Sequence, residues 1–395
     1  MAAMHTSKHV RPVLALAALG LALITSACGA GASAPKVPTD PATLKTVDTA
    51  VQQAYTGTDR PMPTSAPPIR PAQNLWIISC SQSAPGCATP TLAMQTAAQK
   101  VGWTATVADG KLDFSTYSNL IRQAIAAKAD AITLVAIDCG SVQQPLQEAR
   151  AAGVKIYGLL SFDCDDPTVR GQKLFDGSLG LGGGTTPLAD YLRGLGATAA
   201  NYIINRTNGA AVVVEIHEDD VLFDKYVGEG FEKALAACSG CASNKVAITA
   251  ADYAGTAVQS KAAAGIARQP NANAVFSPVD ALITLGVGQA SRALPQGSIL
   301  AGIGGLPPNV EQIAAGGPQT FVAGLPFTRI GWAAVDDLNR ILRNQPQVDQ
   351  GIGTQAIDAQ HNLPKKPAFY DGNVNAEGAP ATDYVAAYGK LWNLA

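Results

Sequence analysis

Residues 129–166 read ADAITLVAIDCGSVQQPLQEARAAGVKIYGLLSFDCDD. The two short apolar runs in this stretch, Ala131–Ile137 and Val154–Leu160, are typical of strands that are buried on both faces of a parallel sheet. Between them, apolar residues recur at helical spacing from Val142 to Ala149. The stretch therefore predicts a β-α-β unit.

Both predicted strands end in an acidic residue followed by a cysteine. These pairs are Asp138-Cys139 and Asp163-Cys164. Because neighbouring parallel strands end at the same edge of a sheet, we expect two carboxylates and two thiols to lie close together there. Open α/β sheets bind their ligands at this carboxyl edge.

The composition is that of a folded chain without a basic surface. Of 395 residues, 47% are hydrophobic and 15% are charged, which argues against disorder. Loss of residues 1–28 would remove Lys8 and Arg11, which leaves 26 of 28 basic residues against 30 acidic ones. Such a chain has no positive field with which to bind nucleic acid.

The N-terminus has the pattern of an export signal. Lys8 and Arg11 precede the apolar run Val13–Ile24, which is shorter than the roughly 20 residues of a membrane span. Thr25-Ser26-Ala27 before Cys28 resembles a bacterial lipobox, although Thr25 stands where leucine is usual. We therefore expect residues 1–28 to be a signal peptide and Cys28 to be lipidated, anchoring the exported protein to the outer face of the cell membrane. An ordinary secretory cleavage is the alternative.

Residues 29–73 are expected to form a tether that contains one short helix. Asp40 can cap this helix, Pro41 suits its first position and Gly57 can end it. The proline-rich stretch Arg60–Pro71 predicts a semi-stiff spacer that holds the body of the protein clear of the membrane.

Six cysteines remain after Cys28, which in an exported chain suggests disulfides. Six thiols allow 15 pairings. The strand ends favour Cys139 with Cys164, and closeness in sequence favours two further pairs, Cys80 with Cys87 and Cys238 with Cys241. A zinc site formed by Cys238, Cys241 and another cysteine pair is the alternative, but no histidine lies near Cys238, so we expect no metal.

From Leu75 the chain alternates regularly between strand and helix patterns in two series. This alternation predicts an α/β protein with two doubly wound, parallel-sheet lobes. The glycine-rich stretch Gly177–Thr185 is the expected first crossing between them. Expected strands are Leu75–Ser79, Thr104–Val107, Ala211–Glu215, Lys245–Thr249, Ala274–Ser277 and Ile299–Gly302; expected helices are Thr91–Val101, Phe114–Ala127, Thr186–Gly194, Tyr226–Ala236, Thr256–Arg268 and Ile283–Leu294.

From about Leu75 to Leu394 the chain resembles the type I periplasmic binding proteins of bacterial ABC importers, in particular the ribose and galactose group. The resemblance rests on short motifs that occur in the order of that family. They are Val135-Ala136-Ile137-Asp138-Cys139, Ala152-Gly153-Val154-Lys155-Ile156, Gly228-Glu229-Gly230-Phe231, Val275-Phe276-Ser277-Pro278-Val279-Asp280, Gly324-Leu325-Pro326 and Ile330-Gly331.

The resemblance implies two lobes joined by a hinge that the chain crosses several times. The N-terminal lobe would comprise residues 74–177 and 326–350, and the C-terminal lobe 178–325 and 351–395. It also implies a non-enzymatic, monomeric protein without a cofactor, which captures a small solute between its lobes and delivers it to an ABC permease. A lipid-anchored receptor that signals to a membrane sensor would have the same features.

The expected cleft lacks the polar groups with which the family holds sugar hydroxyls. Lys225 and Val227 replace arginines, Val279 replaces an asparagine, Gly304 an aspartate and Gly324 a glutamine. Since a site that binds hydroxyls needs such groups, we expect a small organic solute that is not a common sugar. A modified or small sugar is the alternative.

Candidate ligand-binding residues follow the predicted strands at the carboxyl edge of each lobe. A strand-end acid can also be a helix cap or loop anchor. Asp138 and Asp280 are expected to face one ligand from opposite lobes. The candidates are Ser81, Gln82, Asp109, Asp138, Asp163, His217, Asp219, Phe223, Tyr253, Asp280, Leu306 and Phe327. At the end of the second strand, Ser161 and Phe162 are alternatives to Asp163.

A secreted hydrolase is disfavoured, since no Gly-x-Ser-x-Gly, His-Glu-x-x-His or phosphate-loop motif is present.

Overall fold

The computed structural model describes residues 38–183 and 186–394, all within the compact unit Val37–Ala395. The predicted signal peptide and lipidated Cys28 lie outside the described residues. Within the described ranges, no helix is both long enough and apolar enough to cross a membrane.

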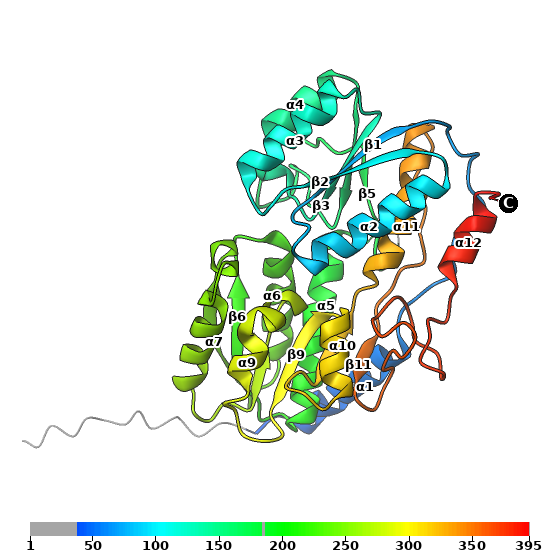
Figure 1. Cartoon of the computed structure of the whole chain (residues 1–395). Helices are drawn as coiled ribbons and strands as arrows, with labels where there is room; N and C mark the ends of the chain where they lie inside the picture. The colour runs from blue at the N-terminus through cyan, green and yellow to red at the C-terminus, as the bar shows by residue number, and fades with distance from the viewer. Residues whose placement is uncertain (1–37, 184–185, 395) are drawn as a thin grey trace, which may run out of the picture. The chain divides into compact units, whose positions relative to one another are not determined.

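The first lobe is built on a five-stranded parallel sheet with strand order β2-β1-β3-β4-β5 (Figure 1). Its strands are β1 (Asn74–Ser79), β2 (Thr104–Asp109), β3 (Ala131–Val135), β4 (Lys155–Leu159) and β5 (Gly177–Ser178). Its helices are α2 (Pro85–Lys100), α3 (Phe114–Ala126) and α4 (Gln143–Ala151), with a short 3-10 turn at Cys139–Ser141.

The predicted β-α-β unit is confirmed, with strands slightly shorter than the apolar runs. All five residues of β3 are buried. The chain leaves β3 at Ala136 and β4 at Leu160, and both residues have a positive φ, 51° and 55°. Non-glycine residues adopt this conformation only under strain or at a turn. The apolar runs therefore continue past the strands into sharp turns at the carboxyl edge.

The second lobe contains a six-stranded sheet of order β11-β10-β9-β8-β6-β7, in which only β11 is antiparallel to its neighbour. The strands are β6 (Val212–Glu218), β7 (Ala242–Ile248), β8 (Ala274–Phe276), β9 (Ile299–Gly304), β10 (Phe321–Gly324) and β11 (Ala356–Asp358). The helices are α5 (Leu188–Arg206), α6 (Leu222–Leu235), α7 (Ala257–Ala267), α8 (Asp280–Leu282), α9 (Gly288–Ser291) and α10 (Pro307–Ala314); a π-helical turn at Ile283–Val287 and a 3-10 turn at Ala250–Tyr253 complete the lobe.

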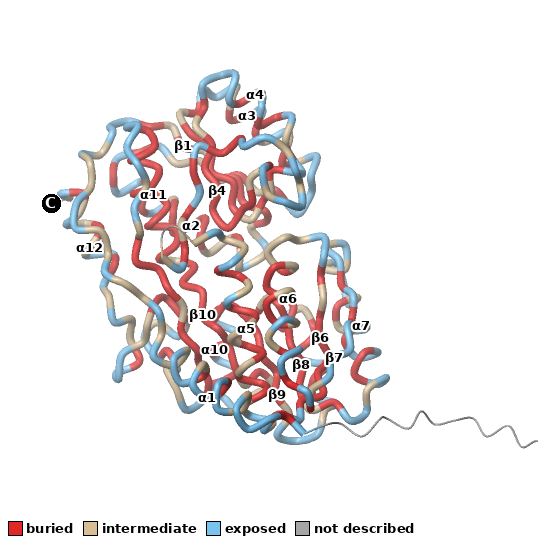
Figure 2. Tube along the Cα trace, turned by 180° about the vertical axis from the view of Figure 1, so that it is seen from behind, coloured by how far each residue is buried: buried red, intermediate tan, exposed pale blue. Residues whose placement is uncertain are grey.

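The chain passes between the lobes more than once. After β5 it enters α5 in the second lobe, and after β10 it returns through α11 (Phe327–Leu342), which packs on α2 and β4. It then adds β11 to the second sheet and ends in α12 (Tyr384–Leu391). The ring of Trp332 in α11 stacks on that of Trp392, with centroids 5.8 Å apart. Figure 2 shows buried residues running through both sheets and along α11.

The prediction that Arg60–Pro71 forms a free spacer is wrong. This stretch lies on the body of the protein. Asn339 donates to the Pro67 carbonyl at 3.1 Å, and Arg340 donates to the Ser65 carbonyl at 2.6 Å. A proline-rich segment keeps its carbonyl groups free, and here donors from α11 satisfy them.

The predicted short helix is present as α1 (Pro41–Thr56), capped by Asp40. Its residues Val47 and Val51 are buried, and it packs against α5. Together with the segment that follows, α1 belongs to the folded body. We call residues 38–73 the N-terminal strap.

Candidate functional site

A cavity of about 340 Å³ lies between the two sheets and is lined by the loops that leave the carboxyl ends of their strands. This is the edge at which α/β sheets bind ligands. Most of its surface is apolar. First-lobe residues Leu112, Phe114, Ile137 and Leu160, second-lobe residues Leu222, Phe223 and Val279, and Phe327 at the start of α11 make up much of the wall.

The charged groups in the wall are all acidic. Asp138 comes from the first lobe, whereas Asp220 and Asp224 come from the loop and helix that follow β6. None of the described residues that line the cavity is lysine or arginine. The cavity therefore suits a solute with an apolar body and groups that donate hydrogen bonds or carry positive charge.

Asp138 lies where the two lobes meet. It accepts a hydrogen bond from the backbone N–H of Phe162 at 3.0 Å, which fixes the neighbouring loop. Burial raises its pKa to about 6, while the N–H groups of Phe162 and of Leu222 at the start of α6 oppose this shift. A first-lobe carboxylate is thus directed at the N-terminus of a second-lobe helix, a position that favours negative charge.

Tyr253 and two buried carboxyl groups form a cluster on the second-lobe side. The Tyr253 hydroxyl lies 2.8 Å from Oε2 of Glu218 and 3.3 Å from Oδ2 of Asp224. Burial and the proximity of Asp224 raise the pKa of Glu218 to about 11, and burial raises the pKa of Asp224 to about 6. The pair therefore retains a proton at neutral pH and can donate a hydrogen bond as well as accept one.

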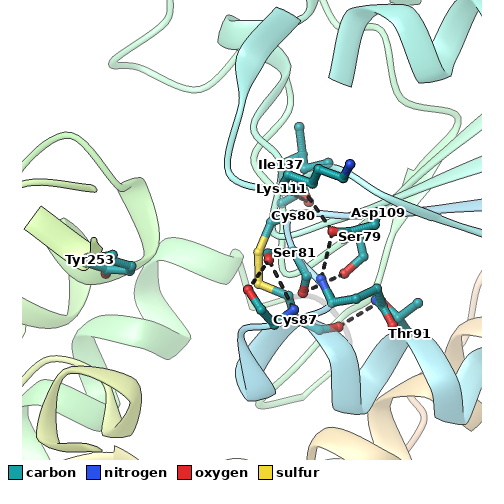
Figure 3. Close-up of a disulfide and its surroundings, with 12 residues drawn as sticks. Ser79, Cys80, Ser81, Cys87, Thr91, Asp109, Lys111, Ile137 and Tyr253 are labelled. Carbon is teal, nitrogen blue, oxygen red and sulfur yellow. Dashed lines mark hydrogen bonds between the residues drawn. A yellow bond between two sulfur atoms is a disulfide. The ribbon is translucent and has the colours of Figure 1, made fainter. Parts of the chain in front are cut away.

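On the first-lobe side, the wall includes the disulfide between Cys80 and Cys87. Figure 3 shows this disulfide beside Ser81, with Tyr253 on the second lobe opposite. Ser81 is buried and pairs with Ser83 at 2.8 Å, so its hydroxyl orders the loop. The structure also joins Cys139 with Cys164 and Cys238 with Cys241, whose Cα atoms are 5.0 and 5.3 Å apart.

Four of the twelve candidates, Asp138, Phe223, Tyr253 and Phe327, line the cavity together. The expectation that Asp280 faces Asp138 across a ligand is wrong. Asp280 is fully buried and accepts hydrogen bonds from Gly305 N–H at 2.6 Å and from the Gln319 amide at 2.9 Å. Burial raises its pKa to about 7, and these donors oppose the shift. Its role is to anchor the loop after β9.

Asp163 and Asp109 are also loop anchors. Asp163 accepts the N–H groups of Leu174 and Phe175 at 2.9 and 3.0 Å, which closes the loop between β4 and β5. Asp109 accepts the N–H groups of Gln82 and Lys111. A carboxylate at a strand end can satisfy free backbone donors without any ligand, and the sequence alone does not distinguish the two roles.

The remaining candidates lie away from the cavity wall. His217 sits within β6 and faces α6, since its ring is 3.4 Å from Glu232 in that helix. Asp219 is exposed and contacts His217. Leu306 is buried in the main hydrophobic core. The wall residue Asp224, which the sequence analysis missed, lies only four residues after Asp220 and on the first turn of α6.

A second hollow, of about 530 Å³, lies at the opposite edge of the second sheet. Its lining includes Ser298 and Thr320, which immediately precede β9 and β10. The amino ends of parallel strands are not where α/β proteins place their binding loops. We therefore take the interlobe cavity as the candidate site.

No family model and no curated protein matched the sequence. Solved structures, in contrast, share the fold. An ABC sugar transporter subunit from Rhodobacter sphaeroides aligns with a TM-score of 0.61 and 19% identity over 73% of this chain and 99% of that one. A solute-binding protein from Mycobacterium smegmatis with bound glycerol aligns with a TM-score of 0.61 and 18% identity over 76% of this chain and 100% of that one. One from Actinobacillus succinogenes with bound D-allose aligns with a TM-score of 0.62 and 17% identity over 74% of this chain and 98% of that one.

The chain therefore has the two-lobed α/β fold of the periplasmic solute-binding proteins of ABC transporters, as the sequence motifs predicted. The aligned structures leave about a quarter of this chain uncovered, although nearly the whole of each of them is matched.

Proposed function

We propose that this protein is a non-enzymatic solute-binding component of an ABC importer, exported and anchored to the outer face of the cell membrane through a lipid on Cys28. The observation that carries the proposal is the cavity formed jointly by the carboxyl-edge loops of both lobes. A solute that contacts both lobes binds their closed arrangement best and shifts the population towards it. The closed form would then dock on the permease.

The lining favours one class of solute. An apolar wall with Asp138, Asp220 and Asp224 but no basic residue fits a small organic molecule that has one cationic or hydrogen-donating end. Carboxylates form strong, charge-assisted hydrogen bonds with such groups. A negatively charged solute would meet three acidic residues and is disfavoured.

A sugar or polyol is the second candidate. It is favoured by the ligands bound in two of the aligned structures, glycerol and D-allose. The cavity wall argues against a sugar. Apolar Val279 and Leu222 occupy wall positions at which a solute with several hydroxyls would need polar partners.

Native mass spectrometry of the exported protein, followed by denaturation and identification of the released molecule, tests the proposal. A thermal-shift panel of amines, glycerol, pentoses and hexoses then ranks the classes. A saturating ligand at 100 times its Kd should stabilise the protein by about 2.7 kcal/mol. A larger response to a common hexose than to any amine would favour the sugar candidate. Turnover of the released molecule by the purified protein would contradict the proposal.

A further inference from the structure

A cluster of potential metal ligands lies between β6 and α6, outside the solute cavity. Glu215 and His217 are two residues apart on β6 and therefore share one face of the strand, and Glu232 approaches them from α6. Nδ1 of His217 is 3.5 Å from Oε1 of Glu215 and 3.4 Å from Oε1 of Glu232. One ligand atom from each residue lies within 4.8 Å of the other two.

Several buried polar atoms in this cluster lack a hydrogen-bond partner among the described residues. They are both carboxylate oxygens of Glu215, which is 0% exposed, and Nδ1 of His217. A buried carboxylate without a partner is costly unless a proton or a cation neutralises it. The side chain of Glu215 is directed at His217 and Glu232, so the missing partner belongs between them.

Asp219 determines which nitrogen of the imidazole is free. Its Oδ2 lies 3.1 Å from Nε2 of His217. A carboxylate only accepts hydrogen bonds, so Nε2 donates to Asp219, and Nδ1 is the ring nitrogen that faces Glu215 and Glu232. A carboxylate that holds the outer nitrogen of a metal-binding histidine in this way is a common arrangement around zinc.

The local charge is negative. Three carboxylates, from Glu215, Glu232 and Asp219, face one cation, Lys245, whose Nζ is 2.5 Å from Oε1 of Glu232. The carboxylates outnumber the lysine, and a bound divalent cation would offset this excess of negative groups.

We propose that Oε atoms of Glu215 and Glu232 and Nδ1 of His217 bind one zinc ion, with Asp219 as a positioning residue. Zinc prefers tetrahedral sites with Zn–N and Zn–O distances of about 2.0–2.1 Å, which separate neighbouring ligand atoms by about 3.3–3.4 Å. The separations from Nδ1 are 3.4 and 3.5 Å. Imidazole with carboxylates is a donor set for zinc rather than for calcium or magnesium.

The site is accessible and its place in the fold suggests an effect on the second lobe. The side chain of Glu232 is 35% exposed, so an ion can enter from its side and reach the buried Nδ1 of His217. Zinc would tie β6 to α6, the helix whose first turn contributes Leu222 and Asp224 to the cavity wall.

The test uses the full exported protein, freed of metal by a chelator and titrated with ZnCl₂ in a calorimeter. We expect one zinc ion per chain and a higher melting temperature in its presence. His217→Gln should abolish both effects, and Asp219→Asn should weaken binding about 10- to 100-fold, as loss of an outer partner does. The control is His361→Gln, since this histidine also pairs with a carboxylate, Asp358, at 2.9 Å. It should bind zinc as the wild type does.

Glu215→Gln separates a metal site from a purely structural ion pair. In the absence of zinc, this variant should melt no earlier than the wild type, because glutamine removes an unpaired buried charge, yet it should no longer respond to zinc. Retained zinc binding in Glu215→Gln or His217→Gln, or no zinc response in the wild type, would overturn the proposal. So would equally tight binding of CaCl₂ that His217→Gln leaves unchanged.

Discussion

The hydroxyl of Tyr226 in the second lobe lies 2.9 and 2.8 Å from the two carboxylate oxygens of Asp166 in the first lobe. The ring of Tyr226 also contacts that of Phe162, with centroids 5.0 Å apart, and the guanidinium of Arg193 lies 4.6 Å from the centroid of the Tyr226 ring. These contacts join the loop after β4 to α6. They therefore connect the two lobes directly.

Tyr226→Phe should loosen the contact between the lobes. A hydrogen bond to a charged group contributes about 1.5 to 3 kcal/mol, and its loss should shift the unliganded protein towards more open arrangements. Small-angle X-ray scattering should show a larger radius of gyration. Tyr117→Phe serves as the control, because its hydroxyl bonds to the Cys80 carbonyl within one lobe. An equal radius for both variants would argue against this role of Tyr226.

Asp59 should contribute more to folding stability than Asp349, although both pair with arginine. Asp59 binds Arg329, whose side chain is 1% exposed, at 2.6 Å, whereas the Asp349–Arg60 pair is about one-third exposed. Asp59→Ala leaves a buried positive charge and should cost about 3 to 5 kcal/mol. Asp349→Ala should cost about 0 to 1 kcal/mol. Urea unfolding measures both, and similar costs would show that the strap does not hold Arg329.

Asp138 and Asp280 should respond differently to replacement by alanine. Asp138→Ala should reduce affinity for the co-purified solute tenfold or more, because a charged hydrogen bond is lost, and should cost about 1 to 3 kcal/mol of folding stability, because the N–H of Phe162 loses its acceptor. Asp280→Ala leaves the N–H of Gly305 and the amide of Gln319 without an acceptor and should cost about 2 to 5 kcal/mol of folding stability. Calorimetric titration beside melting curves separates the two. Normal solute affinity in Asp138→Ala would exclude it from the site.

Glu218 should make the protein less stable as the pH rises. Its pKa is raised in the folded state, so between pH 5 and 8 the folded protein keeps a proton that the unfolded chain releases. The contribution of Glu218 to stability is then greatest at low pH and falls by up to about 1.4 kcal/mol per pH unit over this window. Glu218→Gln removes this dependence and should gain melting temperature at pH 8 more than at pH 5.

Glu148→Gln is the control for this pH dependence, since Arg122 lowers the pKa of Glu148. It should not flatten the decline in stability between pH 5 and 8. A parallel decline in the wild type and in Glu218→Gln would mean that Glu218 is ionised in the folded protein.

The disulfide between Cys139 and Cys164 should stabilise the protein more than that between Cys238 and Cys241. The first spans 25 residues of sequence and the second only three. In the chain-entropy model these loops correspond to about 3 to 4 and about 2 kcal/mol. Peptide mapping without reduction should recover both cross-links. Paired serine substitutions then compare their effects on urea unfolding, and recovery of free Cys139 from the exported protein would refute the first bond.

The sequence by itself predicted the fold class, because short apolar runs such as Ala131–Ile137 alternate with helical spacing, which is typical of parallel strands joined by crossover helices. It also predicted Asp138 and Tyr253 at the cavity, since the ends of parallel strands share one edge. Only the tertiary structure decided which strand-end acids remain free. Asp280 accepts the N–H of Gly305 in another loop, Asp163 accepts the N–H of Phe175 at the far end of its own loop, and the strap is fixed by α11. Such hydrogen bonds depend on where the folded chain places its unpaired donors, and that placement has no local pattern.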